Sequence, residues 1–167
     1  MIVKGESLLS RWEEYRDLRL EALQAIPQAF LDDVDYAQSL SAKAWQQKMN
    51  SMFFEEVDGK FVGMIGAYRE DKMKIHHIMH VVSFYVQPNH RGIGIGKSLL
   101  QCVIDLAKSD ETVKKLQLGV INTQTVAHEL YLSMGFKDVA YLKFAVRIQD
   151  TFFDEYLMEL HLHKPSE

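Results

Sequence analysis

The sequence predicts a single mixed α/β domain over residues 1–167, with strands and helices in the order βααβββαβαββ. Three observations support this class. Asp58-Gly59 between two apolar runs is typical of a tight hairpin turn. A β-branched run, a glycine-rich loop and a helical pattern follow one another over residues 81–107. The rest of the chain alternates between helical and strand patterns, without a repeat, a low-complexity segment or a linker.

The composition is that of an ordinary soluble globular protein. The 167 residues are 47% hydrophobic and 25% charged, which suits one continuous core. The net charge of -4 argues against a general nucleic-acid binder. The single cysteine, Cys102, cannot form an internal disulfide, which favours a reducing, cytoplasmic location. We expect neither a membrane span nor a signal peptide, because no apolar run approaches about 20 residues and the N-terminus lacks a signal pattern.

The chain begins with a short predicted strand over residues 1–4. Ser7 or Ser10 is then expected to cap a helix that Pro27 ends. Residues 29–40 hold three aspartates and are predicted to be an irregular acidic loop.

Ser41 is expected to cap a second short helix that runs through Met49. Strands over residues 52–57 and 60–68 form the predicted hairpin. A third strand over residues 74–86 completes an antiparallel meander. Gly63 and Gly66 within the hairpin suggest a bulge or a close backbone approach.

After the glycine loop, the pattern predicts a helix, a strand over residues 115–121, a second helix and two final strands over 141–148 and 152–162. Thr123 or Thr125 is expected to cap the second helix, and Gly135 to end it. The apolar faces of the two helices are predicted to be Leu99, Leu100, Val103, Ile104 and Ala107, and Val126, Ala127, Leu130, Tyr131 and Met134.

The glycine loop is predicted to hold a pyrophosphate. Gly92, Gly94 and Gly96 leave backbone N–H groups uncovered at a helix N-terminus, which favours an anion there. The dinucleotide fingerprint is excluded because it needs Gly-x-Gly-x-x-Gly. Gly96-Lys97-Ser98 matches the end of a P-loop, but position 91, where that motif needs its first glycine, is Arg91.

Arg91-Gly92-Ile93-Gly94-Ile95-Gly96 instead resembles the Arg/Gln-x-x-Gly-x-Gly/Ala signature of the GNAT superfamily of acetyl-CoA-dependent N-acetyltransferases. The resemblance continues downstream, where Ala127-x-x-Leu130-Tyr131-x-x-x-Gly135-Phe136 is similar to the second signature of the family. It covers nearly the whole chain and implies a mixed, mostly antiparallel central sheet flanked by helices.

The resemblance implies acetyl-CoA as co-substrate, with its pantetheine arm along the strand that ends at Val86 and a backbone N–H near Val86 on the thioester carbonyl. Arg91 would add charge and a forked donor for phosphate. Gln124 stands where many relatives carry Asn. The residues expected to bind the cofactor are Phe84, Tyr85, Val86, Arg91, Gly92, Ile93, Gly94, Ile95, Gly96, Lys97, Ser98 and Gln124.

Acetyl transfer by direct attack needs a neutral amine and a proton for the departing thiolate. Tyr131 occupies the tyrosine position of the second signature and is the expected proton donor. His80, on the strand that leads to the loop, is the candidate base, because histidine titrates near neutral pH. His76 and His80 would lie about 13 Å apart on a strand, too far to share a metal ion, and His161 and His163 have no partner ligands. We therefore expect no metal.

The acceptor is expected to be a primary amine of a small molecule or a peptide, not a nucleic acid or a membrane. Asp32, Asp33, Asp35 and Tyr36 are candidates for attracting a cationic amine. A homodimer is one possible assembly. Two other functions stay open: a non-catalytic acyl-CoA-binding or sensing module on the same fold, and a nucleotide-binding switch built on Gly96-Lys97-Ser98.

Overall fold

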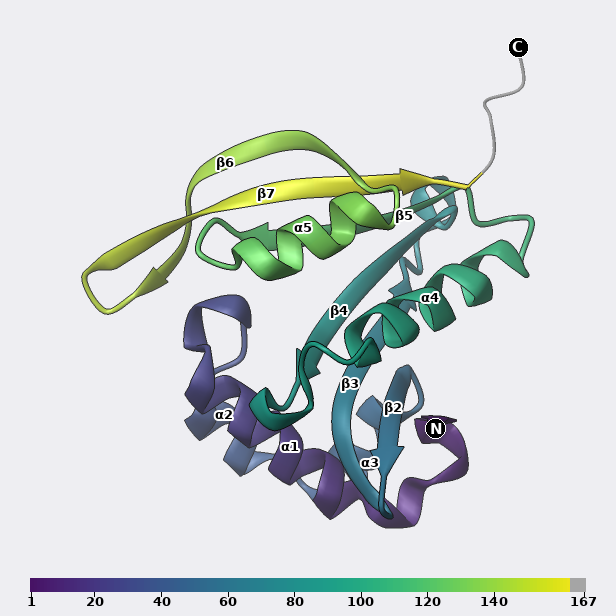
Figure 1. Cartoon of the computed structure of the whole chain (residues 1–167), viewed down its shortest axis with the longest axis vertical. Coiled ribbons are helices and arrows are strands. Elements are labelled where there is room, and N and C mark those ends of the chain that lie inside the picture. The colour runs from purple at the N-terminus through teal and green to yellow at the C-terminus, as the bar shows by residue number, and fades with distance from the viewer. Residues whose placement is uncertain (163–167) are drawn as a thin grey trace. The chain divides into compact units, whose positions relative to one another are not determined.

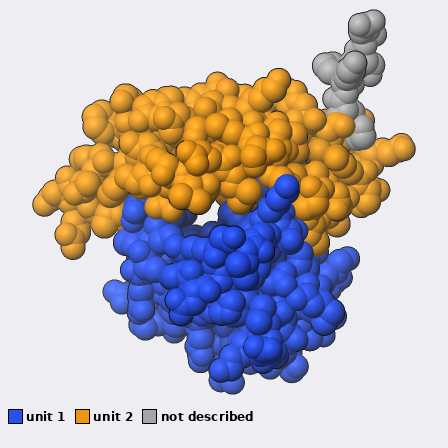
Figure 2. Space-filling view, viewed as in Figure 1, with its two compact units in different colours: residues 1–66, 83–100 blue, residues 67–82, 101–167 orange. Residues whose placement is uncertain are grey.

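The computed structural model describes residues 1–162 (Figure 1). Two compact units divide the chain, residues 1–66 with 83–100 (unit 1) and residues 67–82 with 101–167 (unit 2) (Figure 2). Strands β3 and β4 and helix α4 each belong partly to both units. The single domain over residues 1–167 stays a prediction.

Seven strands form one sheet in the order β1-β2-β3-β4-β5-β7-β6. Four neighbouring pairs, β1–β2, β2–β3, β5–β7 and β6–β7, are antiparallel, and β4–β5 is parallel. This confirms the predicted mixed, mostly antiparallel sheet flanked by helices. The strands are β1 Ile2–Lys4, β2 Met52–Val57, β3 Lys60–Arg69, β4 Ile78–Val86, β5 Lys115–Ile121, β6 Lys137–Ile148 and β7 Thr151–His161.

Unit 1 holds helices α1 (Trp12–Ala25), α2 (Val34–Ser39) and α3 (Ala42–Met49), with α1 in contact with both of the others (Figure 1). Their apolar faces pack with β2 and β3 around an aromatic core. Tyr15 meets the Trp45 ring edge-on at 5.2 Å, and Phe54 stacks on Phe61 at 4.3 Å. Aromatic pairs of this kind add stability beyond the area they bury.

Two N-terminal predictions are wrong, and one is confirmed. Neither Ser7 nor Ser10 caps α1, because two short 3-10 turns carry the chain to the first helical residue and Arg11 takes the cap position. The acidic segment is not wholly irregular, since it contains α2, whose N–H at Tyr36 donates to the Asp33 carboxylate at 2.7 Å. Ser41 does cap α3, through the N–H of Ala44 at 3.2 Å.

The hairpin prediction is confirmed, with Asp58 and Gly59 both at positive φ, 50° and 77°. Gly63 marks a close approach, because a Cβ there would lie 3.0 Å from Leu99 Cδ1 and 3.4 Å from the Tyr85 carbonyl oxygen. Strand β4 begins at Ile78 rather than at residue 74, since residues 73–75 form a 3-10 turn.

The predicted apolar face of α4 (Ile95–Lys108) is confirmed, since its five residues are at most 2% exposed. In unit 2, helix α5 (Thr125–Ser133) packs on β7, where the His128 ring stacks on Tyr156 at 4.4 Å. Neither Thr123 nor Thr125 caps α5; Gln124 holds the cap position without a side-chain bond. Val126 does not join the apolar face, because it is 80% exposed.

The C-terminal end of α5 is built as predicted. Gly135, at φ 95°, donates its N–H to Leu132 O, and Phe136 donates to Tyr131 O, both at 3.1 Å. This pair of bonds is a Schellman motif, which needs a left-handed residue that glycine supplies at little cost.

The final strands are confirmed, although β6 starts four residues before the predicted Tyr141. Among the described residues, no helix is both long and apolar enough to cross a membrane.

Candidate functional site

The glycine loop enters α4 with its backbone open. Gly92 and Gly94 have φ values of 78° and 93°, and a Cβ at either position would meet nothing within 4 Å. The N–H of Ser98 donates to Gly94 O at 3.0 Å, which is the first bond of the helix. The N–H groups of residues 95–97 precede any intrahelical acceptor. This arrangement fits an anionic ligand such as a pyrophosphate.

The side chains of the loop are mostly turned to solvent. Ile93 is 71% exposed, and Arg91, Lys97 and Ser98 are exposed as well. Ile95 is buried beside Gly63 of β3, where a Cβ would lie 3.3 Å from the Ile95 Cγ2 atom. This contact anchors the loop. The loop therefore offers main-chain donors and nearby cations on a fixed backbone.

Arg91 ties the loop to the strand before it. Its Nε donates to the carbonyl of Val86 at 2.8 Å, and its guanidinium lies 5.5 Å from the centre of the Tyr85 ring. One donor of the fork is thus used within the protein. The other nitrogens of the guanidinium stay on an exposed side chain, where a phosphate oxygen could accept from them.

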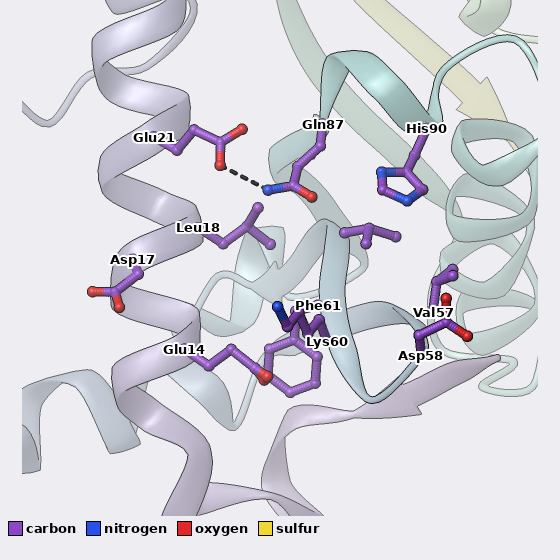
Figure 3. Close-up of a pocket in the computed structure, with 11 residues that line it drawn as sticks. Glu14, Asp17, Leu18, Glu21, Val57, Asp58, Lys60, Phe61, Gln87 and His90 are labelled. Atoms are coloured by element: carbon purple, nitrogen blue, oxygen red, sulfur yellow. Dashed lines mark hydrogen bonds between the residues drawn. The ribbon is translucent and has the colours of Figure 1, made fainter.

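A carboxylate on α1 fixes the end of β4. Glu21 accepts from the Tyr85 hydroxyl at 2.9 Å. It also accepts from Gln87 Nε2 at 2.7 Å (Figure 3). The Tyr85 side chain therefore points into the unit 1 core, and only its main chain could serve a ligand along the strand. Burial, followed by the bond to Glu21, raises the pKa of Tyr85 to about 12.

Unit 1 contains a pocket of about 570 Å³ between α1, the β2–β3 hairpin and the turn after β4 (Figure 3). Its lining is rich in carboxylates, several of which have protein partners. Glu14 accepts from Arg11 at 2.6 Å, Asp17 from Arg16 at 2.9 Å, and Glu21 from Gln87. Of these contacts, the one between Glu21 and Gln87 helps to hold the segment that leads into the loop.

Tyr131, the predicted proton donor, lies on α5 and is 6% exposed. Its ring packs against Phe136 at 5.8 Å, and its carbonyl accepts the N–H groups of Met134 and Phe136. Burial raises the pKa of its hydroxyl, so the phenol stays protonated near neutral pH. Gln124, predicted to bind the cofactor, is half-buried just before the same helix and uses its N–H on Ile121 O at 2.8 Å.

His80, the predicted base, stacks on Tyr68 at 4.9 Å, and its Nε2 lies 3.2 Å from Glu70 Oε1. That nitrogen is shielded from solvent and forms no hydrogen bond.

Unit 2 also brings together two residues that sequence analysis missed. A Cβ on Gly119 would lie 2.5–2.7 Å from the carboxylate atoms of Glu155, so this carboxylate occupies the space that a side chain on β5 would fill. Two sequence signals could have indicated the contact: a lone glycine inside a strand pattern, and an acidic pair, Asp154-Glu155, inside an apolar strand.

The acidic residues proposed for amine attraction have mixed roles. Asp32 lies 3.2 Å from Arg19 Nη2 and 3.7 Å from Lys48 Nζ, and Asp33 caps α2. Asp35 and Tyr36 are exposed on that helix.

Within residues 1–162, no group of three or more His, Cys, Asp or Glu side chains is placed to hold a metal ion. His76 is not on β4 but follows the 3-10 turn before it, and His163 lies outside the described residues.

Comparisons with known proteins agree with both signatures. The model of the acetyltransferase (GNAT) family matches residues 12–136. Human N-acetyltransferase 8B is 32% identical over 103 residues, which cover 57% of this chain and 42% of that protein. The N-alpha-acetyltransferase of Sulfurisphaera tokodaii is 32% identical over 100 residues, covering 56% and 60%. The chain thus spans less than two thirds of the length of these curated relatives.

Solved structures share the fold. An acetyltransferase of the GNAT family from Streptococcus pneumoniae superimposes with a TM-score of 0.85 at 20% identity, over 98% of this chain and 99% of that one. The acetyltransferase yncA from Salmonella typhimurium, solved with its cofactor acetyl-CoA, gives 0.77 at 19% identity, over 100% and 96%. With the family model matching most of its length, this chain belongs to the GNAT acetyltransferase family.

Proposed function

We propose that the chain is an acetyl-CoA-dependent N-acetyltransferase that transfers the acetyl group by direct attack of a primary amine on a small molecule or a peptide. The open backbone of the glycine loop carries this proposal. Gly92 and Gly94 present their amides with no side chain to cover them, directly before the α4 N-terminus. Relatives named as N-acetyltransferases, and a similar structure solved with acetyl-CoA, support the choice of ligand.

In this proposal the loop and α4 hold the pyrophosphate of the donor. The N–H groups of residues 95–97 donate to its oxygens, and Arg91 adds a charge-assisted contact. Phe84 and Val86 present main-chain groups to the pantetheine arm, while Tyr85 and Glu21 keep that strand end in place. Acetyl-CoA supplies an activated acyl group and a thiolate leaving group.

The chemistry requires two proton movements. The amine, with a pKa of about 10 when free, must lose a proton before it attacks. The departing thiolate must gain one, and Tyr131 is proposed to donate it. A phenol is protonated near neutral pH and can donate across hydrogen-bond distance, as that role requires.

The acceptor class is proposed from the chemistry alone. An alkylamine or a peptide N-terminus arrives as a cation, so acidic side chains favour its approach. The relatives' names include both an N-alpha-acetyltransferase and an N-acetylaspartate synthetase, so peptide and small-molecule amines are both to be tested.

The test has two stages. Thermal unfolding is first compared with acetyl-CoA, CoA and ATP with Mg²⁺; we expect acetyl-CoA and CoA to raise Tm and ATP to have a smaller effect. A panel of alkylamines, amino acids, polyamines and peptide N-termini is then assayed for release of free CoA thiol.

Each result separates the proposal from a rival. Binding of acetyl-CoA with no thiol released by any amine would favour a non-catalytic acyl-CoA-binding module. A larger Tm rise with ATP and Mg²⁺ than with acetyl-CoA would favour a nucleotide switch built on residues 96–98.

A further inference from the structure

Glu155 occupies an unusual position on β7. Its Cα partner across the antiparallel ladder is Ile121, and its carboxylate reaches diagonally to Gly119. Any side chain at Gly119 would collide with that carboxylate, at 2.5–2.7 Å. The glycine on β5 and the glutamate on β7 therefore form one unit, in which the missing side chain of one strand is replaced by an acid from the next.

The Glu155 carboxylate has no hydrogen bond or ion pair with any described residue, although it is only partly exposed. Burial raises its pKa above the usual range for glutamate. A half-buried carboxylate without a cation is costly, and a positively charged ligand would relieve that cost.

Glu159, four residues along the same strand, shows the contrast. It accepts from Lys115 Nζ at 2.5 Å and from Gln117 Nε2 at 2.9 Å, and His161 lies 3.0 Å away. Burial tends to raise the pKa of Glu159, but these contacts outweigh it and the pKa is lowered. Of these two glutamates on one face of β7, Glu159 is neutralised by contacts within the protein, and Glu155 remains available to a cationic ligand.

Glu155 lies close to the point where the parallel pairing of β4 with β5 ends. The parallel β4–β5 pairing runs from Ile78–Lys115 to His80–Gln117, and Gly119 lies two residues beyond its last pair. Among the described residues, the titratable groups that strand pairing places on this face are His80 from β4, Lys115 from β5, Lys137 from β6, and Glu159 and His161 from β7. From β6, Leu142 pairs with Glu155 and brings no charge.

We propose that Glu155, seated over Gly119, is the catalytic base that binds the acceptor ammonium and removes its proton. This inference rests on the proposed function. It assigns to a carboxylate brought from β7 the role that sequence analysis gave to His80, whose Nε2 is already enclosed beside Glu70.

The step balances without any other reactant. The ammonium gives one proton to the Glu155 carboxylate and becomes a neutral amine. The amine lone pair forms the N–C bond to the acetyl carbon, and the C–S bond breaks with its electrons on sulfur. The nitrogen, which carries a positive charge after it attacks, loses its second proton to solvent and leaves a neutral amide. The thiolate takes its proton from Tyr131, which is reprotonated from solvent, and Glu155 returns its own proton to solvent.

The decisive measurement is kcat/KM against pH for Glu155→Gln, with the best alkylamine of the acceptor panel. Glutamine keeps the shape but cannot accept the proton. We expect a loss of about 100-fold near pH 7, within the usual range for removal of a general base. The loss should shrink to less than about tenfold near pH 9.5, where more of the amine is already neutral in solution.

Two further variants test the geometry. Gly119→Ala places a methyl group where the carboxylate lies and should lower kcat/KM near pH 7 by about tenfold or more. Combined with Glu155→Gln, it should add little, because both changes remove the same interaction. Glu159→Gln is the matched control on the same strand face, and it should keep the wild-type pH dependence. The rise in Tm with acetyl-CoA checks that every variant is folded.

The outcomes are distinct. Turnover by Glu155→Gln that is unchanged, or reduced equally at all pH values, would overturn the base assignment while leaving the proposed function intact. A pH-dependent loss in His80→Gln without one in Glu155→Gln would return the role to His80. If the wild-type protein releases no thiol with any amine, the proposed function itself fails, and this inference fails with it.

Discussion

The glycine loop and the β5–β7 face serve the proposed reaction by different physical means. The loop offers backbone N–H groups, held by positive φ values at Gly92 and Gly94, which favour glycine and leave no side chain at those positions. The β5–β7 face offers one side chain, Glu155, whose position depends on an empty site on a neighbouring strand. The proposed donor binding is thus local in sequence, whereas the proposed proton transfer depends on the pairing of distant strands.

This difference predicts which parameter, donor affinity or kcat, a substitution in each region should change. Backbone donors are lost only when the backbone itself changes, so the loop should respond in donor affinity and hardly in kcat. Proton-transfer groups act on the reacting atoms, so their loss should appear in kcat with donor binding preserved.

The largest effect is expected for Tyr131→Phe. Removing the hydroxyl takes away the proposed proton donor, so kcat should fall by about 100-fold or more. The Tm rise with acetyl-CoA should stay close to the wild-type value, since the ring and its packing on Phe136 remain. A variant that loses acetyl-CoA binding but keeps its turnover would contradict the assignment of Tyr131 to proton donation.

Gly94→Ala should act on the donor side. A left-handed backbone costs a non-glycine residue about 1–2 kcal/mol, so the loop should leave its present conformation and KM for acetyl-CoA should rise by about tenfold. Gly59→Ala is the matched control, because Gly59 has a φ of 77° and equally open space but lies in the hairpin turn. It should lower Tm without changing KM; an equal rise in KM in both variants would mean that the effect is only global strain.

A smaller loss is expected for Arg91→Gln. An exposed cation contributes about 1 kcal/mol to a phosphate contact, so the Kd for acetyl-CoA should rise by about fivefold. The rise should be largest at low ionic strength, because salt screens exposed charges. Binding isotherms at two salt concentrations would measure it, and a salt-independent change would point instead to the lost bond to Val86 O.

Another effect concerns stability at high pH. Burial raises the pKa of Tyr15, and burial together with Glu21 raises that of Tyr85, in both cases to about 12 from 10 in the unfolded chain. The folded state therefore binds more protons, so stability should be complete below pH 10 and fall as pH rises toward 12. Urea midpoints between pH 8 and 11.5 should decline, and less steeply in Tyr85→Phe; a midpoint that rises over this range would contradict the assignment.

The same contrast explains what could be predicted from sequence. The hairpin at Asp58-Gly59, the glycine loop and the Gly135 helix end depend on residues next to one another, so their patterns were sufficient. The cap of α2 by Asp33 was missed because three aspartates within four residues also suit a loop. The contact of Glu155 with Gly119 depends on strand register across 36 residues, which no local pattern encodes. The site residues themselves stay predictions until they are tested.

The Schellman motif at the end of α5 has a consequence for enzyme design. Because Phe136 donates to the carbonyl of Tyr131, the last turn of the helix fixes the sequence spacing between Tyr131 and Gly135. An insertion or deletion between them would rotate the phenol by about 100° around the helix axis for each residue, since 3.6 residues make a turn. The spacing within the second signature therefore sets the direction in which the Tyr131 hydroxyl points. A design that moves Tyr131 must move Gly135 with it.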